Sequence, residues 1–394
     1  MPAKRIAFPT KDDLLTQAAN HESLSSLARA NGIKSSTFIS RLRIEGWHDE
    51  VVGALGVRTS DVHEVNREEI LEQRIKELEQ AHRASRKLEV FEERALAAIE
   101  GAIEVRRPTH KPKAIRGKKQ GEHEMVLLWS DLHAGEVVSE EETGGNAYDW
   151  RIMMERHTRL REAIASFVAH RPYPVRKLHV LALGDMLSGD IHDELVETNE
   201  VPLAEATIQL GIDGAEWLAS LLDIFDSIDF SGVVGNHPRS SRKPQAKHAF
   251  NNADWLAYHT MRLRLREELR IGFNIPKAPF RTVTVADRWK ILMFHGDSIR
   301  SSMPGVPWGG VTRRVNALQS QFPGIDMYAC GHFHSLNLVQ SNAGRIAMNG
   351  SIKGVDEYSL KAFGGGSAPQ QMLLTFHRDK GLTDMSICDL EPPR

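Results

Sequence analysis

Five short motifs place Asp, Asn and His side chains directly after apolar, strand-like runs. They are Asp131-Leu132-His133, Gly184-Asp185, Gly235-Asn236-His237, His295-Gly296-Asp297 and Gly331-His332-Phe333-His334. Carboxylate, amide and imidazole groups are donors suited to Mn²⁺, Fe or Zn²⁺. Taken singly, each motif is a frequent chance match, and a lone His at a strand end is usually a satisfied core or surface residue. Five such motifs in order favour a shared metal site.

The segments that must position these side chains alternate between strand-like and helix-like patterns. The predicted strands are 125–129, 178–183, 232–234, 282–285, 291–294, 327–329, 336–340 and 345–348. The predicted helices are 150–170, 203–225, 250–270 and 308–321. This alternation predicts an α/β domain over residues 122–394. In open α/β sheets, ligands bind at the carboxyl ends of strands, where the five motifs are expected to lie.

The ordered set of motifs resembles the signature of the calcineurin-like metallophosphoesterase superfamily, over residues 124–350. The resemblance implies a sandwich of two central sheets flanked by helices. It implies a first metal on Asp131, His133, Asp185 and His334, and a second on Asp185, Asn236, His295 and His332. His237 would face the substrate as a catalytic residue. Two divalent ions are therefore expected, Mn²⁺ first, with Fe, Zn²⁺, Ni²⁺ or Mg²⁺ as alternatives.

A pair of divalent cations would make hydroxide available near neutral pH and orient a phosphoester for in-line displacement. A shared carboxylate at Asp185 would keep the two ions close despite their repulsion. His237, if protonated, could stabilise the transition state or donate a proton to the leaving oxygen. The third motif departs from the family, because Pro238 follows His237 where Asp or Glu is usual. Another residue must then orient His237, and Asp190 and His192 are candidates by position.

The N-terminal residues 1–60 carry a second pattern, which is helical. Residues 24–47 read LSSLARANGIKSSTFISRLRIEGW, in which Gly32 separates two short helices and Ser35 is expected to cap the second. Two helices joined by a Gly-containing turn predict a helix-turn-helix. The second helix would display polar and basic side chains suited to DNA, namely Lys34, Ser36, Thr37, Ser40, Arg41 and Arg43. A plain helical packing or oligomer module is the alternative.

Residues 61–105 are rich in Glu, Arg, Lys, Leu and Ala, with apolar residues partly at heptad spacing. This predicts a long helix or an imperfect coiled coil, or a helical arm packed on its own chain. Residues 106–121 form a predicted linker whose basic side chains either are simply solvated or follow a phosphate backbone.

A second basic segment follows the third motif and contains Arg239, Arg242, Lys243 and Lys247. Together with the helix-turn-helix and the linker, it favours DNA as the substrate and partner. The sequence is similar in style to phage and bacterial metallophosphoesterases that resemble the nuclease subunit of the double-strand-break repair complex. We therefore expect a DNA endo- or exonuclease. The alternatives are a phosphomonoesterase or nucleotide phosphodiesterase acting on small molecules or phosphoproteins, and a DNA-binding regulator with a structural metal site.

The composition is that of a globular protein, with 394 residues, 41% hydrophobic and 26% charged residues and a net charge of -2. Cys330 and Cys388 share no short spacing, which argues against a disulfide framework or a zinc ribbon. No apolar run approaches the roughly 20 residues that span a bilayer. These features predict a cytoplasmic protein, bacterial or in a phage-infected cell, with no membrane partner. The long helix suggests a homo-oligomer, a dimer or higher.

Overall fold

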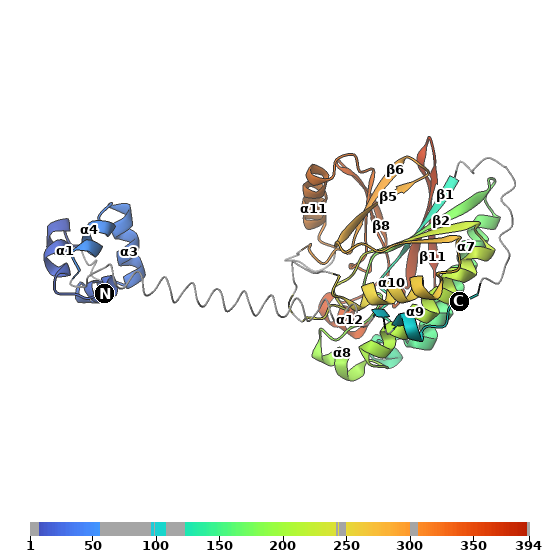
Figure 1. Cartoon of the computed structure of the whole chain (residues 1–394), viewed down its shortest axis with the longest axis horizontal. Helices are drawn as coiled ribbons and strands as arrows, with labels where there is room; N and C mark the ends of the chain where they lie inside the picture. The colour runs from blue at the N-terminus through green and yellow to red at the C-terminus, as the bar shows by residue number, and fades with distance from the viewer. Residues whose placement is uncertain are drawn as a thin grey trace. The chain divides into compact units, whose positions relative to one another are not determined.

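The computed structural model describes residues 8–55, 96–97, 99–107, 123–241, 243, 250–299 and 306–391. The chain divides into two compact units, Met1–Phe91 and Glu92–Arg394 (Figure 1). Most of the predicted long helix over 61–105, and the predicted linker beyond residue 107, lie outside the described residues. Arg106, at the start of that linker, is bonded to the larger unit, since its backbone N–H donates to the Arg264 carbonyl at 2.9 Å. The domain boundaries stay a prediction.

The N-terminal unit consists of four short helices around a small apolar core. They are α1 Lys11–Ala18, α2 Leu24–Ala30, α3 Ser35–Ile44 and α4 His48–Gly53. Thr10 and Ser23 cap α1 and α2 by accepting backbone N–H groups of their first turns. All four helices contribute fully buried side chains to the core, which contains Leu14, Ala18, Leu27, Ala28, Phe38, Leu42 and Val51.

The turn between α2 and α3 contains Gly32, as expected, at a φ of 66° that favours glycine. The Ile33 N–H donates to the Ala28 carbonyl at 2.9 Å and closes the end of α2. The expected capping role of Ser35 is wrong. Ser35 is the first residue of α3, Lys34 is the N-cap, and within the described residues no side chain caps this helix start.

In the larger unit, the first sheet has six strands in the order β11-β10-β1-β2-β3-β4. Its strands are β1 His123–Trp129, β2 Val175–Ala182, β3 Ser227–Gly232, β4 Ile271–Asn274, β10 Gln370–His377 and β11 Gly381–Asp389. The strands β1 to β4 run parallel, while β10 pairs antiparallel with both β1 and β11. The carboxyl ends of β1, β2 and β3 therefore meet at one edge.

The second sheet has five strands in the order β5-β6-β7-β9-β8. They are β5 Phe280–Val285, β6 Trp289–Phe294, β7 Met327–Cys330, β8 Asn337–Ser341 and β9 Gly344–Met348. The strands β6, β7 and β9 are parallel, and β6 and β7 carry the remaining motifs at their carboxyl ends. Mixed α/β architecture with two sheets flanked by helices is thus confirmed.

Alternation along β1 explains how the layers pack. Val126 and Leu128 enter the core between the two sheets, while Met125, Leu127 and Trp129 face the helical side. The helices on that side are α7 Trp150–Ala169, α9 Leu203–Ser220 and α10 Ala253–Arg264, and α11 Trp308–Gln321 packs on the second sheet (Figure 1). Shorter elements are α6 Glu140–Thr143, α8 Asp193–Thr198, the 3₁₀ turn Leu221–Asp223 and α12 Glu357–Phe363.

Several boundaries differ from the predicted ones. The strand predicted at 232–234 is β3, which lies earlier and ends at Gly232. The strands β4, β10 and β11 were not predicted, and α10 is shorter than the expected helix over 250–270. Among the described residues, none of the helices combines the length and apolar character needed to cross a membrane.

Candidate metal centre

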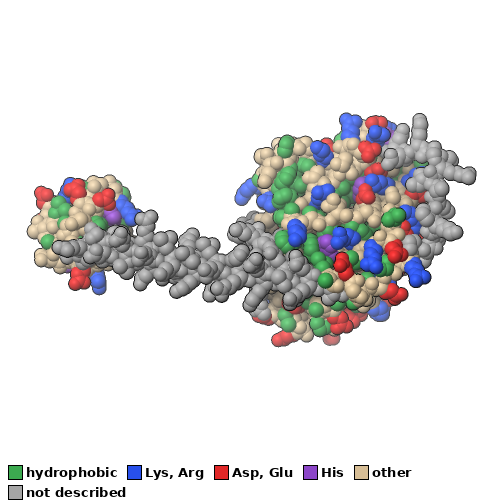
Figure 2. Space-filling model, in the orientation of Figure 1, with side chains coloured by type: hydrophobic (Ala, Val, Ile, Leu, Met, Phe, Trp, Pro, Cys, Tyr) green, Lys and Arg blue, Asp and Glu red, His purple; other side chains and the backbone are tan. Residues whose placement is uncertain are grey.

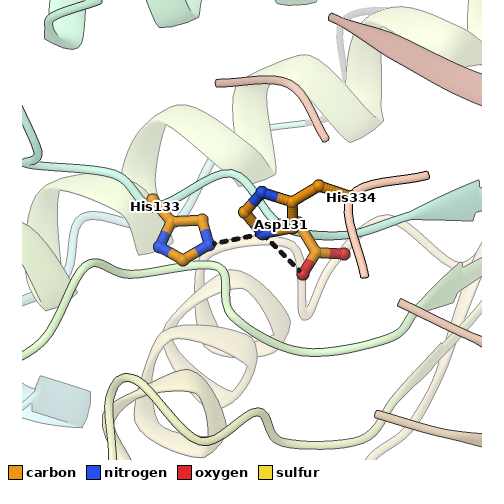
Figure 3. Close-up of side chains that lie close together, drawn as sticks. All are labelled: Asp131, His133 and His334. Atoms are coloured by element: carbon orange, nitrogen blue, oxygen red, sulfur yellow. Dashed lines mark hydrogen bonds and ion pairs between the residues drawn. The ribbon is translucent and has the colours of Figure 1, made fainter. Parts of the chain in front are cut away.

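The first group of donors joins the loops after β1 and β7. His133 Nε2 lies 3.1 Å from His334 Nε2, and His334 Nε2 lies 3.4 Å from Asp131 Oδ1 (Figure 3). Each of these three residues offers a ligand atom, and the three atoms lie within 4.8 Å of one another. Asp131 and His133 are buried and His334 is half-buried, so a bound ion would be largely screened from bulk water.

The second group joins the loops after β2, β6 and β7, and contains Asp185, His295 and His332. His295 Nε2 lies 2.9 Å from Asp185 Oδ2 and 3.1 Å from the Asn236 side-chain oxygen. The side-chain oxygen of Asn236 therefore lies next to these three donors. All seven residues predicted as metal ligands are thus brought to one edge of the sandwich.

A third group connects the first two. Ligand atoms of His133, Asp185 and His237 also lie within 4.8 Å of one another, and the rings of His133 and His237 meet edge to face with centroids 4.4 Å apart. Asp185 belongs to both this group and the second, which suits the bridging role expected of it. His237 is close enough to act as a ligand, so its expected role outside the metal shell stays a prediction.

The donors themselves have unusual backbone conformations. Asp131, His133, Asp185, His332 and His334 have φ values of 55°, 51°, 51°, 69° and 49°, all in the left-handed region. A residue other than glycine is strained there, and such strain concentrates at functional sites. The backbone therefore turns at the ligands themselves, which directs their side chains inward immediately after β1, β2 and β7.

Two of the motif glycines, Gly235 and Gly331, leave room for the carboxylates. A Cβ on Gly235 would lie 2.1 Å from Asp185 Oδ1, and a Cβ on Gly331 would lie 2.4 Å from Asp131 Oδ2. Real Cβ atoms do not approach so closely, so a side chain at either position would displace a carboxylate.

Hydrogen bonds between the loops fix the donors in place. The Asp131 and His133 N–H groups donate to the carbonyls of Gly184 and Asp185, each at 3.1 Å, which continues the parallel pairing of β1 and β2. The two carboxylates also accept backbone N–H groups from other motif loops. Asp131 Oδ1 accepts the His332 N–H at 2.9 Å, and Asp185 Oδ1 accepts the His237 N–H at 2.8 Å. Each carboxylate is therefore oriented by a different motif loop.

His295 shows that the donor set fits a cation. Its Nδ1 lies 2.8 Å from the Leu183 carbonyl, which only accepts, so Nδ1 carries the hydrogen. Nε2 then faces the oxygens of Asp185 and Asn236, an arrangement that either a second proton or a divalent cation satisfies. Burial acts to lower the pKa of His295, but the charge and hydrogen bond of Asp185, together with the charges of Asp131 and Asp297, raise it to about 10.

The other donors are poised to bind without competing protons. Burial lowers the pKa of His133 well below its ordinary value and that of His332 to about 4. Burial acts to raise the pKa of Asp185, but the charge and hydrogen bond of His295, together with the charges of His237 and His133, bring it well below its usual range. Neutral imidazoles and ionised carboxylates are the forms in which these side chains bind metals.

His237 is oriented by a main-chain group. Its Nδ1 lies 3.0 Å from the Ser188 carbonyl, so Nδ1 donates and Nε2 is left for a proton or a ligand. Gly189 makes this approach possible, because a Cβ there would lie 2.0 Å from the His237 carbonyl oxygen. Neither candidate named from position is this partner. The His192 ring lies 5.6 Å from the His237 ring, and Asp190 is exposed.

Two residues at the start of α10 hold the second and third motifs and were missed in the sequence. Asp254 accepts the N–H groups of Met186 at 3.0 Å and Gly235 at 2.9 Å, while Asn252 donates to the Gly235 carbonyl at 2.8 Å. Burial, added to the nearby charge of Asp185, raises the pKa of Asp254 to about 7. The available signal in the sequence was Asn252, a residue type favoured at the N-cap, two residues before Asp254 at the start of a predicted helix.

Asp131 has a comparable set of supports. Ser130 Oγ donates to Asp131 Oδ2 at 2.5 Å and accepts from the Asn349 amide at 3.0 Å. The same amide donates to Gln371 Oε1 at 2.9 Å, and all three of these supporting residues are buried. Polar residues at the end of β9 and within β10 were the available signal.

The candidate nucleic-acid-binding residues fall in both units. Lys34, Ser36, Thr37 and Arg41 are exposed at α3. A shallow depression on that helix is lined by Ser36, Thr37, Ser40, Arg41 and Ile44.

In the larger unit, Lys243 is exposed, and Arg242 and Lys247 lie outside the described residues. Arg239 is half-buried and donates to the carbonyls of Asn236 at 3.1 Å and Ser241 at 2.8 Å, so it also braces the third motif.

The fold and the site define a mixed α/β protein whose clustered carboxylates and imidazoles can hold divalent cations. No family model and no curated protein matches the chain. Among solved structures it is similar to vacuolar protein sorting 29 from Cryptosporidium parvum, with 16% identity and a TM-score of 0.30, over 67% of this chain and 97% of that one.

It is also similar to Vps29 complexed with Zn²⁺ from Entamoeba histolytica, with 13% identity and a TM-score of 0.29, over 68% of this chain and 99% of that one. A third similar structure is a novel archaeal phosphodiesterase, with 12% identity and a TM-score of 0.31, over 67% of this chain and 99% of that one.

Proposed function

We propose that this protein is a two-metal phosphoesterase that hydrolyses phosphodiester bonds, with DNA as its substrate. The observation that carries the proposal is the convergence of three donor groups, linked through His133 and Asp185, from five separate strand ends. The order of these donors is the one that resembles the calcineurin-like metallophosphoesterases. Asp131, His133, Asp185 and His334 would hold one ion, and Asp185, Asn236, His295 and His332 the other.

When bound, a pair of divalent cations supplies Lewis acidity toward the phosphoryl group and lowers the pKa of water. The chain supplies position and charge balance. Asp185 is shared between the two sets of donors, and its orientation is fixed by the His237 N–H. His237 keeps its Nδ1 hydrogen on the Ser188 carbonyl, so its exchangeable proton is on Nε2. There it can donate to the leaving oxygen once protonated.

The proposal of DNA rests on the surface of α3 and on the basic loop after the third motif. The exposed side chains Lys34, Ser36, Thr37 and Arg41 line the helix that a helix-turn-helix places in the major groove. Figure 2 shows that, on the face in view, Lys and Arg are interspersed with Asp and Glu over the larger unit. We therefore propose DNA contact at α3 and at the basic segment that contains Lys243, and not across the face of the larger unit in view.

A hydrolysis assay with Mn²⁺, Mg²⁺ and Zn²⁺ tests the proposal on plasmid, linear duplex and single-stranded DNA. We expect Mn²⁺-dependent nicking, together with hydrolysis of bis-p-nitrophenyl phosphate, and loss of both in Asp185→Asn. Cleavage of p-nitrophenyl phosphate alone would favour the phosphomonoesterase. Binding of DNA without any hydrolysis would favour the regulator with a structural metal.

Substitution on α3 tests the DNA contact separately. Arg41→Ala should weaken DNA binding and make the slope of log K against log salt concentration shallower by about one, because one fewer counterion is released. Hydrolysis of the small diester should be unchanged. Arg266→Ala, which removes an exposed charge from the turn after α10, is the matched control. An unchanged affinity for DNA in Arg41→Ala would remove α3 from the proposal.

A dimer or higher oligomer is also proposed, and light scattering on the full chain tests it.

A further inference from the structure

A buried ion-pair cluster adjoins the metal centre on the side of His133. Glu136, Lys353 and Asp356 are 6%, 2% and 6% exposed. Lys353 Nζ donates to Glu136 Oε1 at 2.8 Å and also to Asp356 Oδ2. Lys353 lies in the segment after β9, and Asp356 caps α12, so the cluster joins these segments to the loop after β1.

The free oxygen of Glu136 lies beside His133. Glu136 Oε2 is 3.4 Å from His133 Nδ1, and neither atom has a hydrogen-bond partner elsewhere in the described part of the chain. The other ring nitrogen of His133 is the one near His334, at 3.1 Å. The imidazole thus lies between a carboxylate on one side and the candidate metal position on the other.

We propose that Glu136 is a positioning residue for the metal centre, and that Lys353 holds it in place. Glu136 keeps the hydrogen of His133 on Nδ1 and so presents the Nε2 lone pair to the cation. Glu136 Oε1 accepts the hydrogen bond from Lys353, which leaves Glu136 Oε2 available to His133. This assignment rests on the proposed two-metal function.

The arrangement of the cluster supports this role. The buried Arg156 guanidinium donates to the Ile352 carbonyl at 2.9 Å and to the Lys353 carbonyl at 2.6 Å, so it holds the backbone at Lys353. Lys353 in turn donates to Glu136 Oε1 and to Asp356, while Glu136 Oε2 faces His133 with no hydrogen-bond partner among the described residues. A purely structural ion pair would not need an unpartnered carboxylate oxygen directed at a metal-binding histidine.

Calorimetric titration of the full chain with Mn²⁺ tests the proposal through Glu136→Gln. The amide keeps the size of the side chain and its contact with Lys353, but loses the charge facing His133. We expect one of the two Mn²⁺ sites to weaken by about 10- to 100-fold, the range for partners of metal-binding histidines. The other site should stay within about twofold of the wild type.

Two further variants separate positioning from stability. Asp356→Asn breaks the other arm of the Lys353 cluster, and should lower the melting temperature without a selective change at either Mn²⁺ site. Glu141→Gln, at an exposed position in α6, should match the wild type. Two unchanged sites in Glu136→Gln, or equal weakening of both sites with a loss of stability like that of Asp356→Asn, would overturn the inference. If the wild-type chain binds no Mn²⁺, the proposed function fails as well.

Discussion

Gly235→Ala should disable the metal centre without removing any ligand. The added Cβ would lie 2.1 Å from Asp185 Oδ1 and 2.2 Å from the Asp185 backbone nitrogen, whereas real Cβ contacts under 3.0 Å are essentially never seen. The carboxylate must therefore move by about 1 Å, or the loop must. A displacement of this size costs roughly 10²-fold in rate, or about 2.7 kcal/mol of the activation barrier.

The assay is the kcat for bis-p-nitrophenyl phosphate with saturating Mn²⁺, together with a Mn²⁺ titration. Because Asp185 contributes to two donor groups, we expect both ions to bind more weakly. Gly309→Ala is the matched control, since nothing lies within 4 Å of its added Cβ. That control substitution, near the start of α11, should leave kcat unchanged and stabilise the fold by about 0.5–1 kcal/mol.

Gly331→Ala provides an independent check, because its Cβ would meet Asp131 Oδ2 at 2.4 Å and not Asp185. It should weaken mainly the ion held by Asp131, His133 and His334. Melting temperatures of the metal-free variants show whether either protein is simply unfolded. Wild-type turnover and two tight Mn²⁺ sites in a folded Gly235→Ala protein would refute the assignment of Asp185 as the shared ligand.

His237→Ala should keep both Mn²⁺ sites and lower kcat by about 10²- to 10⁴-fold, the usual range for a lost general acid; loss of an ion would make His237 a ligand. Burial acts to raise the pKa of Asp356, but Lys353 and the Ser359 hydrogen bonds lower it to about 2, so its stabilising effect is complete above about pH 4 and is lost as the pH falls toward 2. Urea unfolding should therefore give Asp356→Asn a deficit of about 2 kcal/mol at pH 7 that shrinks toward pH 2; a constant deficit would contradict this. Phe38→Ala should destabilise the N-terminal unit by about 3–5 kcal/mol and leave diester hydrolysis intact, as followed by circular dichroism and kcat. Because His334 has a φ of 49°, His334→Gly should be more stable than His334→Ala by about 1 kcal/mol in the metal-free protein, and equal melting temperatures would argue against strain there.

The sequence was most informative where chemistry and strand ends coincide. Each motif follows an apolar run, and the carboxyl ends of parallel strands lie at one edge, so the donors could be expected to meet without knowledge of the sheet order. The structure brings them together from β1, β2 and β3 in one sheet and from β6 and β7 in the other. The assembly of the site was therefore predictable, even though the pairing of the two sheets was not.

The strands that escaped prediction depend on distant partners. In β10 almost every residue is buried on both faces, which removes the alternation that identifies a strand, and its partner β1 is at the other end of the domain. The strand β3 was predicted, but too late in the chain, because the polar residues Asp229 and Ser231 obscure the apolar face formed by Ile228 and Phe230. Asp229 pairs with Lys177 of β2 at 2.7 Å, a contact that local sequence does not reveal.

The supports of the metal centre were equally hidden, for a different reason. Glu136, Asn252, Asp254 and Asn349 act through backbone groups or through other side chains, so their types and spacing match no ligand pattern. Polar residues of this kind can be recognised in a sequence only as exceptions within apolar surroundings. Their roles become evident once the loops that they join are placed together.

The left-handed donors link these observations. Each such residue costs roughly 1 kcal/mol or more, and persists only where the surroundings determine its conformation. Here the surroundings are the three apolar cores of the larger unit and the hydrogen bonds that tie each carboxylate to another motif loop. A donor set held under strain in advance of binding needs little rearrangement when a cation arrives. The two sheets and their helices therefore act as the rigid support that keeps these three strained loops in register, and the packing energy of those layers is what stabilises the site.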